Sequence, residues 1–402
     1  MKLGLGNIRT LLAALGNPQN NYLKVQVAGT NGKGSVCAFL DAICVSAGVR
    51  AGLFTSPHLI SITERIRING VDISEADFAR HATLVSETGE SLLATSELEY
   101  RPTFFEQITA IALVAFADAK IELAILETGL GGRLDATTAA NAEIVAITPI
   151  DIDHQEYLGE TLAEIAAEKA AITRERSVVV VSDQRPEADL VISERLDDLG
   201  IVAMRTEDVR TSGGRGWLKF HTEHAEYEVE TLGLNGRHQI ENAKVTILLA
   251  QTLRKHFQIS TQNIIDGLKN ARHPGRLEFS GRYLFDGAHN PAGAEALKEF
   301  LDELTTQPIT MIFGAMKEKD ISAMAEILFP RVETLILTQP ENSRAMATVD
   351  LAKYADENTK MILTNNVADA VQKAETLSND NRLILVTGSL YLIGEVKKIL
   401  NN

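Results

Sequence analysis

The feature that most constrains the fold is an apolar run followed at once by a glycine-rich turn that contains a lysine. Residues 23–28 alternate as a β-strand does, and residues 35–47 are apolar at helical spacing up to Gly48. Between them lies Gly29-Thr30-Asn31-Gly32-Lys33-Gly34-Ser35. In a phosphate-binding loop, backbone N–H groups and a helix N-terminus surround an anion in this layout. The region therefore predicts an α/β domain that binds the phosphates of a nucleotide.

The turn departs from the general phosphate-loop pattern at two positions. Val27 stands where the first glycine is usual, and Gly34 delays the hydroxyl to Ser35. A glycine-rich turn alone is weak evidence, because glycine is common in any tight turn. The position between strand and helix favours nucleotide binding, with Lys33 reaching the outer phosphates. Thr30 and Asn31 either line this loop or only form its turn.

Length and charge limit the class of protein. A chain of 402 residues exceeds one typical core, so two or three domains are expected. The net charge of −15 argues against non-specific binding to nucleic acid, whose phosphates would be repelled. The two cysteines, Cys37 and Cys44, fit buried apolar positions and form no disulfide framework, which points to the reducing cytoplasm.

No segment of the sequence has the character of a membrane anchor or a signal peptide. Residues 1–16 include Asn7 and Arg9 and repeat their apolar residues at helical spacing. The longest apolar stretch, residues 108–117, is too short to span a bilayer and predicts a buried helix. A cytoplasmic protein with no membrane partner is expected.

Polar residues follow each of three further predicted strands, at residues 49–54, 121–126 and 144–147. The carboxyl ends of parallel strands are where open α/β sheets bind ligands. Glu127 at the end of a central strand is expected to hold Mg²⁺ or its water. His154 is either a second metal ligand or a structural histidine.

Lys169 follows Glu168 in a helix predicted to begin near Thr161. An ammonium group buried near a metal is unfavourable unless it is paired or modified. Lys169 is therefore either a modified group near the metal or an ordinary lysine on a helix surface.

The second half of the chain changes its pattern twice. Residues 178–182 predict a fifth strand, residues 183–215 are not assigned, and alternation in 216–233 predicts an antiparallel hairpin. After a linker at 273–276, strands are expected at residues 283–285, 309–313, 335–338 and 383–387, and they alternate with helices.

These patterns predict a doubly wound N-terminal domain with a phosphate-binding loop, residues 1–274. They also predict a smaller, Rossmann-like domain, residues 275–402. Its first strand ends in Asp286-Gly287-Ala288-His289-Asn290-Pro291. Because both domains present polar loops, the active site is expected in a cleft between them.

Several motifs, taken in order, resemble one known family. They are Gly29 to Ser35, Thr55-Ser56-Pro57-His58-Leu59, Leu126 to Asp135, Asp153-His154, Glu168-Lys169-Ala170 and Asp286 to Pro291. Together they resemble the folylpolyglutamate synthase/dihydrofolate synthase branch of the Mur ligases. The resemblance runs from Leu3 to Tyr391, and the Gly34-Ser35 ending is this branch's own form.

The resemblance implies ATP and Mg²⁺ as cofactors, with Mg²⁺ at two sites. The metal ligands would be Ser56, Glu127 and His154. The nucleotide contacts would be Asn31, Gly32, Lys33, Gly34, Ser35, Asn242, Arg276 and Asp286. Lys33, Lys169 and His289 would be catalytic, and Lys169 would carry a carbamate, an anion that can lie beside metal.

The resemblance also implies the other substrates, which are pteroate or folate and L-glutamate, and a monomer. The pterin substrate would lie near Leu3, Gly4, Leu5, Thr103, Phe105, Glu106, Leu134 and Asp135. Two residues depart from the family pattern, because Thr138 replaces the usual Asn and Ala171 the usual Gly. The N-terminus is also short ahead of Leu3.

The expected reaction is ATP-dependent formation of an amide bond. L-Glutamate would be added to dihydropteroate, to the γ-carboxyl of a folate, or to both, through an acyl phosphate. One alternative is a Mur-type ligase that acts on another carboxylic acid. Another is a nucleotide-binding protein without catalysis, which would predict the loss of Lys33, Glu127 or His154, all of which are present.

Overall fold

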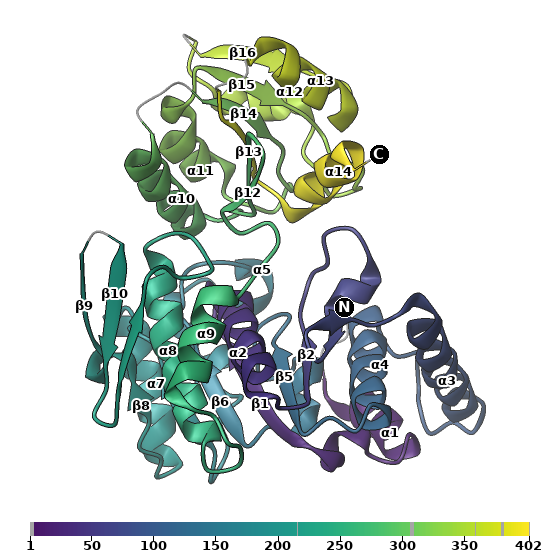
Figure 1. Ribbon diagram of the computed structural model, residues 1–402. Helices are drawn as coiled ribbons and strands as arrows, with labels where there is room; N and C mark the ends of the chain where they lie inside the picture. Colours follow the sequence, from purple (N-terminus) through teal and green to yellow (C-terminus); the bar gives the residue numbers. More distant parts are fainter. Residues whose placement is uncertain (1–3, 215, 306–308, 358, 379–381, 402) are drawn as a thin grey trace. The chain divides into compact units, whose positions relative to one another are not determined.

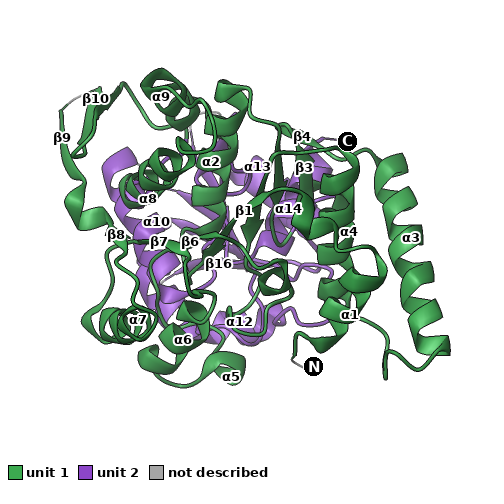
Figure 2. Ribbon diagram, turned by 90° about the horizontal axis from the view of Figure 1, so that it is seen from below, with its two compact units in different colours: residues 1–57, 62–233, 240–272 green, residues 58–61, 234–239, 273–402 purple. Residues whose placement is uncertain are grey.

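The computed structural model describes residues 4–214, 216–305, 309–357, 359–378 and 382–401 (Figure 1). The chain forms two compact units, coloured separately in Figure 2. Unit 1 comprises residues up to 57 together with 62–233 and 240–272. Unit 2 comprises 58–61, 234–239 and 273–402. Two short segments from the first half of the chain and its middle thus belong with the C-terminal region.

Unit 1 is built on an eight-stranded sheet in the order β4-β3-β2-β5-β1-β6-β7-β8. Its strands from β2 to β8 along this order run parallel, and β3 and β4 form an antiparallel edge. The strands are β1 (Leu23–Ala28), β2 (Ala51–Phe54), β3 (Ile66–Ile68), β4 (Val71–Asp72), β5 (Leu123–Glu127), β6 (Ile144–Ile147), β7 (Val178–Val181) and β8 (Met204–Arg205). The predicted parallel strands of this half are confirmed.

Helices bury the apolar faces of this sheet in separate groups. Helices α1 (Gly6–Ala14), α3 (Glu75–Ala94) and α4 (Phe104–Asp118) form one core with residues of β2 and β5. Helices α5 (Gln155–Leu158), α6 (Leu162–Ala170) and α7 (Pro186–Asp198) pack with β6 and β7. Helix α2 (Lys33–Ala47) packs against α9 (Thr261–Asn270). β5 and β6 are buried along their whole length, which explains their nearly continuous apolar sequence.

A small antiparallel sheet, β9 (Arg210–Gly214), β10 (Trp217–His221) and β11 (Glu226–Val229), precedes α8 (His238–Leu253). The predicted hairpin in 216–233 is confirmed as β10 and β11. The third strand of this small sheet, β9, and helix α7 lie in residues 183–215, to which the sequence assigned no structure. Short 3-10 helices lie at Pro18–Asn21, Ile62–Arg65, Ala136–Ala140, Thr206–Asp208, Phe329–Arg331 and Ala352–Tyr354.

Unit 2 is a three-layer α/β structure on a six-stranded sheet, ordered β12-β13-β17-β14-β15-β16. Alternate strand residues face two cores, one with α10 and α11 and the other with α13 and α14 (Figure 1). The strands are β12 (Glu278–Ser280), β13 (Tyr283–Asp286), β14 (Thr310–Phe313), β15 (Thr334–Leu337), β16 (Lys360–Leu363) and β17 (Ile384–Thr387). The helices are α10 (Pro291–Leu304), α11 (Ile321–Leu328), α12 (Thr348–Leu351), α13 (Val367–Leu377) and α14 (Leu390–Leu400).

The predicted fold class is confirmed, since both units are α/β with largely parallel sheets. The sequence missed the two edge strands of unit 2, β12 and β16. Within the described parts of the chain, no helix combines the length and apolar character needed to cross a bilayer.

Candidate active site

The glycine-rich turn joins β1 to α2 and depends on two of its glycines. Gly29 and Gly32 have φ angles of +151° and +87°, which residues with a Cβ atom rarely adopt. A Cβ atom at Gly29 would collide with Thr148, and one at Gly32 with Asn242. The fold therefore brings Asn242 of α8, a predicted nucleotide contact, up to the predicted phosphate-binding turn.

The turn is held by the segment that follows β6. The backbone N–H groups of Thr30 and Asn31 donate to the carbonyl oxygen of Pro149, at 3.0 and 3.1 Å. The Thr30 hydroxyl donates to the carbonyl of Asp151 at 2.9 Å. Thr30 thus has a role in shaping the turn, one of the two roles that its sequence left open.

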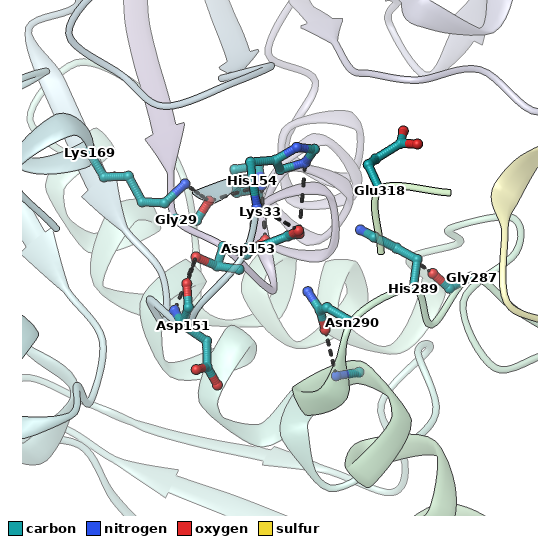
Figure 3. A network of polar contacts seen from close by, with 12 residues as sticks. Gly29, Lys33, Asp151, Asp153, His154, Lys169, Gly287, His289, Asn290 and Glu318 are labelled. Carbon is teal, nitrogen blue, oxygen red and sulfur yellow. Dashed lines mark hydrogen bonds and ion pairs between the residues drawn. The ribbon is translucent and has the colours of Figure 1, made fainter. Parts of the chain in front are cut away.

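Two lysine side chains meet at one backbone carbonyl of this turn (Figure 3). Lys33 Nζ donates to Gly29 O at 2.9 Å and to Thr30 O at 3.0 Å. Lys169 Nζ, from the last turn of α6, donates to the same Gly29 O at 2.9 Å. The Lys169 side chain is buried, so the alternative of an ordinary lysine on a helix surface is wrong.

Burial changes the acidity of the Lys169 ammonium. Loss of hydration, assisted by the positive charge of Lys33, lowers the pKa of Lys169 to about 7. Asp153 and Asp135 oppose this shift. A neutral, nucleophilic Lys169 amine is therefore accessible at a much lower pH than in an exposed lysine.

Two of the predicted metal ligands lie together at the carboxyl ends of neighbouring parallel strands. The backbone N–H of Ser56, after β2, donates to Glu127 Oε2 at 3.0 Å, at the end of β5. His154 caps α5 with a φ angle of +53°, and its Nε2 lies 3.8 Å from Asp153 Oδ2. His154 follows β6, which pairs with β1 on the side away from β5.

Glu127 and Ser56 offer a carboxylate and a hydroxyl oxygen, the ligand types that Mg²⁺ prefers. Among the described residues, no three His, Cys, Asp or Glu side chains gather as a metal site of their own. Mg²⁺ is commonly bound by only one or two protein oxygens, with nucleotide phosphates and water as its other ligands. Glu127 and Ser56 fit a Mg²⁺ ion of this kind.

Asp135 shapes the loop that follows β5. Its carboxylate accepts hydrogen bonds from the N–H groups of Gly129 and Leu130, at 3.0 and 2.9 Å, and from the N–H of Thr137 at 3.0 Å. The Thr137 hydroxyl donates to it as well. Burial raises the pKa of Asp135, while these four hydrogen bonds favour its ionised form. The predicted contact of Asp135 with substrate stays a prediction.

Three of the predicted substrate residues, Thr103, Phe105 and Glu106, lie at the start of α4. Thr103 and Glu106 bond to one another's backbone N–H groups in a capping box, which accounts for both residue types. The Phe105 ring packs 6.0 Å from the Phe54 ring and closes over Gly129. Phe105 thus joins the helix start to the loop after β5.

The other predicted substrate positions have different surroundings. Leu5 packs against the same apolar core as Phe105. Leu134 is half-buried, Gly4 is exposed, and Leu3 lies outside the described residues. The Arg65 guanidinium lies 5.4 Å from the centre of the exposed Phe104 ring, a contact between residues far apart in the sequence that the sequence did not predict.

The predicted residues of unit 2 converge on one loop after β13. Asp286 accepts the N–H groups of Leu277 and Ala288, both at 3.0 Å. Burial raises the pKa of Asp286, and the charge of Arg276 opposes that shift. Arg276 Nη1 donates to Gly287 O at 3.1 Å. His289 Nδ1 lies 2.7 Å from the same oxygen (Figure 3). A carbonyl can only accept, so the ring proton of neutral His289 resides on Nδ1.

Gln26, in the central strand β1, is a buried polar residue to which the sequence assigned no role. Its Nε2 donates to the hydroxyls of Thr137 and Thr138, at 3.0 and 2.8 Å. Those hydroxyls donate in turn to Asp135 Oδ1 and Gly132 O. Gln26 thus connects the strand before the glycine turn to the loop after β5. A polar residue in an otherwise apolar strand was the available signal.

These features define a class of protein. Three features lie together: the glycine turn with Lys33, the Glu127 carboxylate at the end of the neighbouring strand β5, and the buried Lys169 amine beside the turn. Together they form the site of an α/β enzyme that uses a nucleotide.

Comparison with known proteins defines the class more narrowly. Residues 27–250 match the Mur ligase middle domain, and residues 275–390 match the glutamate ligase domain of Mur ligases. Dihydrofolate synthase/folylpolyglutamate synthase of Bacillus subtilis is 35% identical over 99% of this chain and 95% of its own length.

Two solved structures are similar along the whole chain. One is Mycobacterium tuberculosis folylpolyglutamate synthase complexed with ADP and AMPPCP, with a TM-score of 0.92, 31% identity and coverage of 99% and 96% of the two chains. The other is the bifunctional folylpolyglutamate synthase/dihydrofolate synthase of Yersinia pestis complexed with AMPPNP and Mn ion. It has a TM-score of 0.88, 28% identity and coverage of 100% and 94%. This chain belongs to the folylpolyglutamate synthase/dihydrofolate synthase family of the Mur ligases, and it is an ATP-dependent ligase.

Proposed function

We propose that this protein adds L-glutamate to dihydropteroate, to the γ-carboxyl of a reduced folate, or to both, through an acyl phosphate. The observation that carries the proposal is the meeting of Lys33 and Lys169 at Gly29 O, within the predicted phosphate-binding turn. The glutamate ligase domain matched by residues 275–390 supports glutamate as the amine.

The chemistry explains why the turn needs a cation. A carboxylate is a poor acylating agent because its leaving group would be oxide. Transfer of the γ-phosphoryl group of ATP to the carboxylate creates a phosphate leaving group, which the α-amine of glutamate then displaces. The first step brings two anions together, so Lys33 must offset their repulsion while the turn fixes the nucleotide.

Mg²⁺ would supply further positive charge on the phosphates, at two sites held by Ser56, Glu127 and His154. The contact between Ser56 N–H and Glu127 Oε2 supports a shared position for the first two. A relative complexed with AMPPNP and Mn ion supports the use of a divalent metal. Asn31, Gly32, Gly34, Ser35 and Asn242 would contribute to nucleotide binding from unit 1.

We further propose that Lys169 reacts with CO₂ to form a carbamate. The neutral amine attacks the carbon of CO₂, a C–N bond forms, and the nitrogen loses one proton to solvent. The buried position and the pKa of about 7 support this reaction, because a neutral amine is available near pH 7. Replacing Lys169 with Ala should lower activity, and added short carboxylates should restore part of it. Wild-type activity of the Ala variant would refute the carbamate.

The other predicted residues complete the assignment. Leu3, Gly4, Leu5, Thr103, Phe105, Glu106, Leu134 and Asp135 would surround the pterin. Residues 1–274 would form the ATP-binding domain, and 275–402 the glutamate-ligase domain. In the latter, Arg276 and Asp286 would contribute to ATP binding and His289 to catalysis. The active protein would be a monomer in the cytoplasm.

The test is phosphate release that depends on ATP, Mg²⁺ and L-glutamate, with dihydropteroate and tetrahydrofolate compared as acceptors. Turnover with either acceptor supports the proposal, and turnover with both assigns a bifunctional enzyme. Binding of ATP without turnover of either acceptor would refute it and favour a Mur-type ligase for another acid. The high coverage of folate-branch relatives favours the folate substrate over that alternative.

A further inference from the structure

We propose that Arg133 is a positioning residue for Lys169. Arg133 clamps the last turn of α6 to the loop after β5, and this clamp holds the Lys169 amine at the glycine turn. The inference rests on the role of Lys169 in the proposed function. It adds two residues, Arg133 and Glu168, whose side chains that role does not use.

The clamp consists of two side-chain contacts and one backbone contact. Arg133 Nη2 and Nε lie 2.8 and 2.9 Å from Glu168 Oε1. The backbone N–H of Arg133 donates to the carbonyl oxygen of Glu168 at 2.8 Å. Two guanidinium donors therefore share one carboxylate oxygen, Oε1, in a charge-assisted contact. All three contacts fall on the residue directly before Lys169.

Gly132 allows the two segments to approach this closely. A Cβ atom at Gly132 would lie 2.6 Å from the carbonyl oxygen of Glu168 and 3.0 Å from that of Lys169. The loop backbone thus lies directly against the backbone that carries Lys169. The opposite end of the same loop is anchored by the four hydrogen bonds to Asp135.

The position of Lys169 makes such support important. Its side chain is 5% exposed, and its hydrogen bond to Gly29 O joins residues that lie 140 positions apart in the sequence. Small changes in the direction of the last turn of α6 would move the amine away from Gly29 O. Misplacement by about 1 Å in a reacting group can lower a rate about a hundredfold.

A competing explanation is that Arg133 and Glu168 form an ordinary surface ion pair. The Arg133 side chain is 56% exposed, and exposed pairs contribute little to stability. The two explanations differ in what they predict. An ordinary pair can be removed without effect on turnover, whereas a positioning pair affects turnover without affecting the stability of the fold.

The test uses the full-length enzyme with Arg133→Met and a matched control, Arg80→Met. Arg80 is also 56% exposed and bonds a carboxylate, Asp118, at 2.8 Å, on the α3–α4 side of unit 1. Three quantities are measured: kcat and KM for ATP, the urea midpoint, and the Lys169 carbamate signal in ¹³C NMR with ¹³C-bicarbonate. Lys169→Ala is measured in parallel.

We expect Arg133→Met to lower kcat about tenfold or more, with KM for ATP changed less than about twofold. Its carbamate signal should be weaker than that of wild type, and its urea midpoint should equal that of Arg80→Met. Arg80→Met should match wild type in all three measurements. Wild-type kcat in Arg133→Met would overturn the inference, as would a lowered kcat with a full carbamate signal or a lowered urea midpoint.

The Lys169→Ala variant distinguishes a wrong role for Lys169 from a wrong role for Arg133. Wild-type activity in Lys169→Ala would show that the proposed role of Lys169 is wrong. Loss of activity in Lys169→Ala together with wild-type activity in Arg133→Met would leave that role intact and overturn only the role of Arg133.

Discussion

Replacing Lys169 with Met should make unit 1 more stable while it impairs turnover. The buried ammonium is unfavourable, since its pKa falls from 10.5 to about 7 on folding. At about 1.4 kcal/mol per pKa unit, this shift lowers the free energy of unfolding by about 5 kcal/mol at pH values where Lys169 stays protonated in the folded protein. At pH 7, close to the pKa of the folded state, the penalty is still about 4 kcal/mol. Met has a similar length and no charge, and Gly29 O keeps its hydrogen bond from Lys33.

The pH dependence gives this prediction a definite sign. Between pH 7 and 10.5 the unfolded chain binds more protons at Lys169 than the folded chain, so the wild type gains stability as pH rises. Below pH 7 both states are protonated and the full penalty applies. The advantage of the Met variant should therefore be largest below pH 7 and should decrease by about 1.4 kcal/mol per pH unit above it.

Urea unfolding in CO₂-free buffer between pH 6 and 9 measures this effect. The fluorescence of Trp217, the single tryptophan of the chain, reports on unit 1 because Trp217 lies in β10. CO₂ is removed so that the free amine of the wild type is compared. A Met variant that is less stable than wild type, or a difference that does not vary with pH, would refute the argument from the buried charge.

Three further changes test other contacts of the site. Lys33→Ala should lower kcat by about a hundredfold or more in the phosphate-release assay, because the turn loses its cation; full activity would contradict its assignment to the phosphates. Glu127→Gln should raise the Mg²⁺ concentration needed for half-maximal activity about tenfold or more; an unchanged Mg²⁺ requirement would exclude Glu127 as a ligand. Gln26→Leu should destabilise unit 1 by about 1–2 kcal/mol, because Thr137 and Thr138 lose a buried donor. An unchanged urea midpoint of Trp217 fluorescence would show that this donor contributes nothing.

The strands that the sequence predicted well are those buried in the middle of each sheet. β1 and β6 lie at the predicted residues because most of their buried positions are apolar, and the buried amide of Gln26 in β1 is hydrogen-bonded. β16 was missed because its side chains are largely exposed at a sheet edge, where no alternation is required. β12 has three residues, too few for a period to emerge.

The site was predictable where it follows from strand order and not where it depends on tertiary approach. Glu127 and Ser56 end neighbouring strands, and polar residues at those ends were expected to bind ligands. The sequence left two roles open for Lys169, because a helical lysine shows its burial only when α6 is packed. Asn242 came from the resemblance alone, since the glycine turn gives no sign of what fills the space beside Gly32.

The assignment of residues 58–61 and 234–239 to unit 2 has a consequence for dissecting this protein. Leu59 packs into the core of α13 and α14, and its backbone carbonyl lies against Gly394. Asn235 donates to the carbonyl of Leu277. A fragment beginning at residue 273 would lack both contacts and expose part of its own core. No single cleavage point separates the two units intact, so autonomous expression of the C-terminal unit calls for a chimaera that grafts both short segments back onto it.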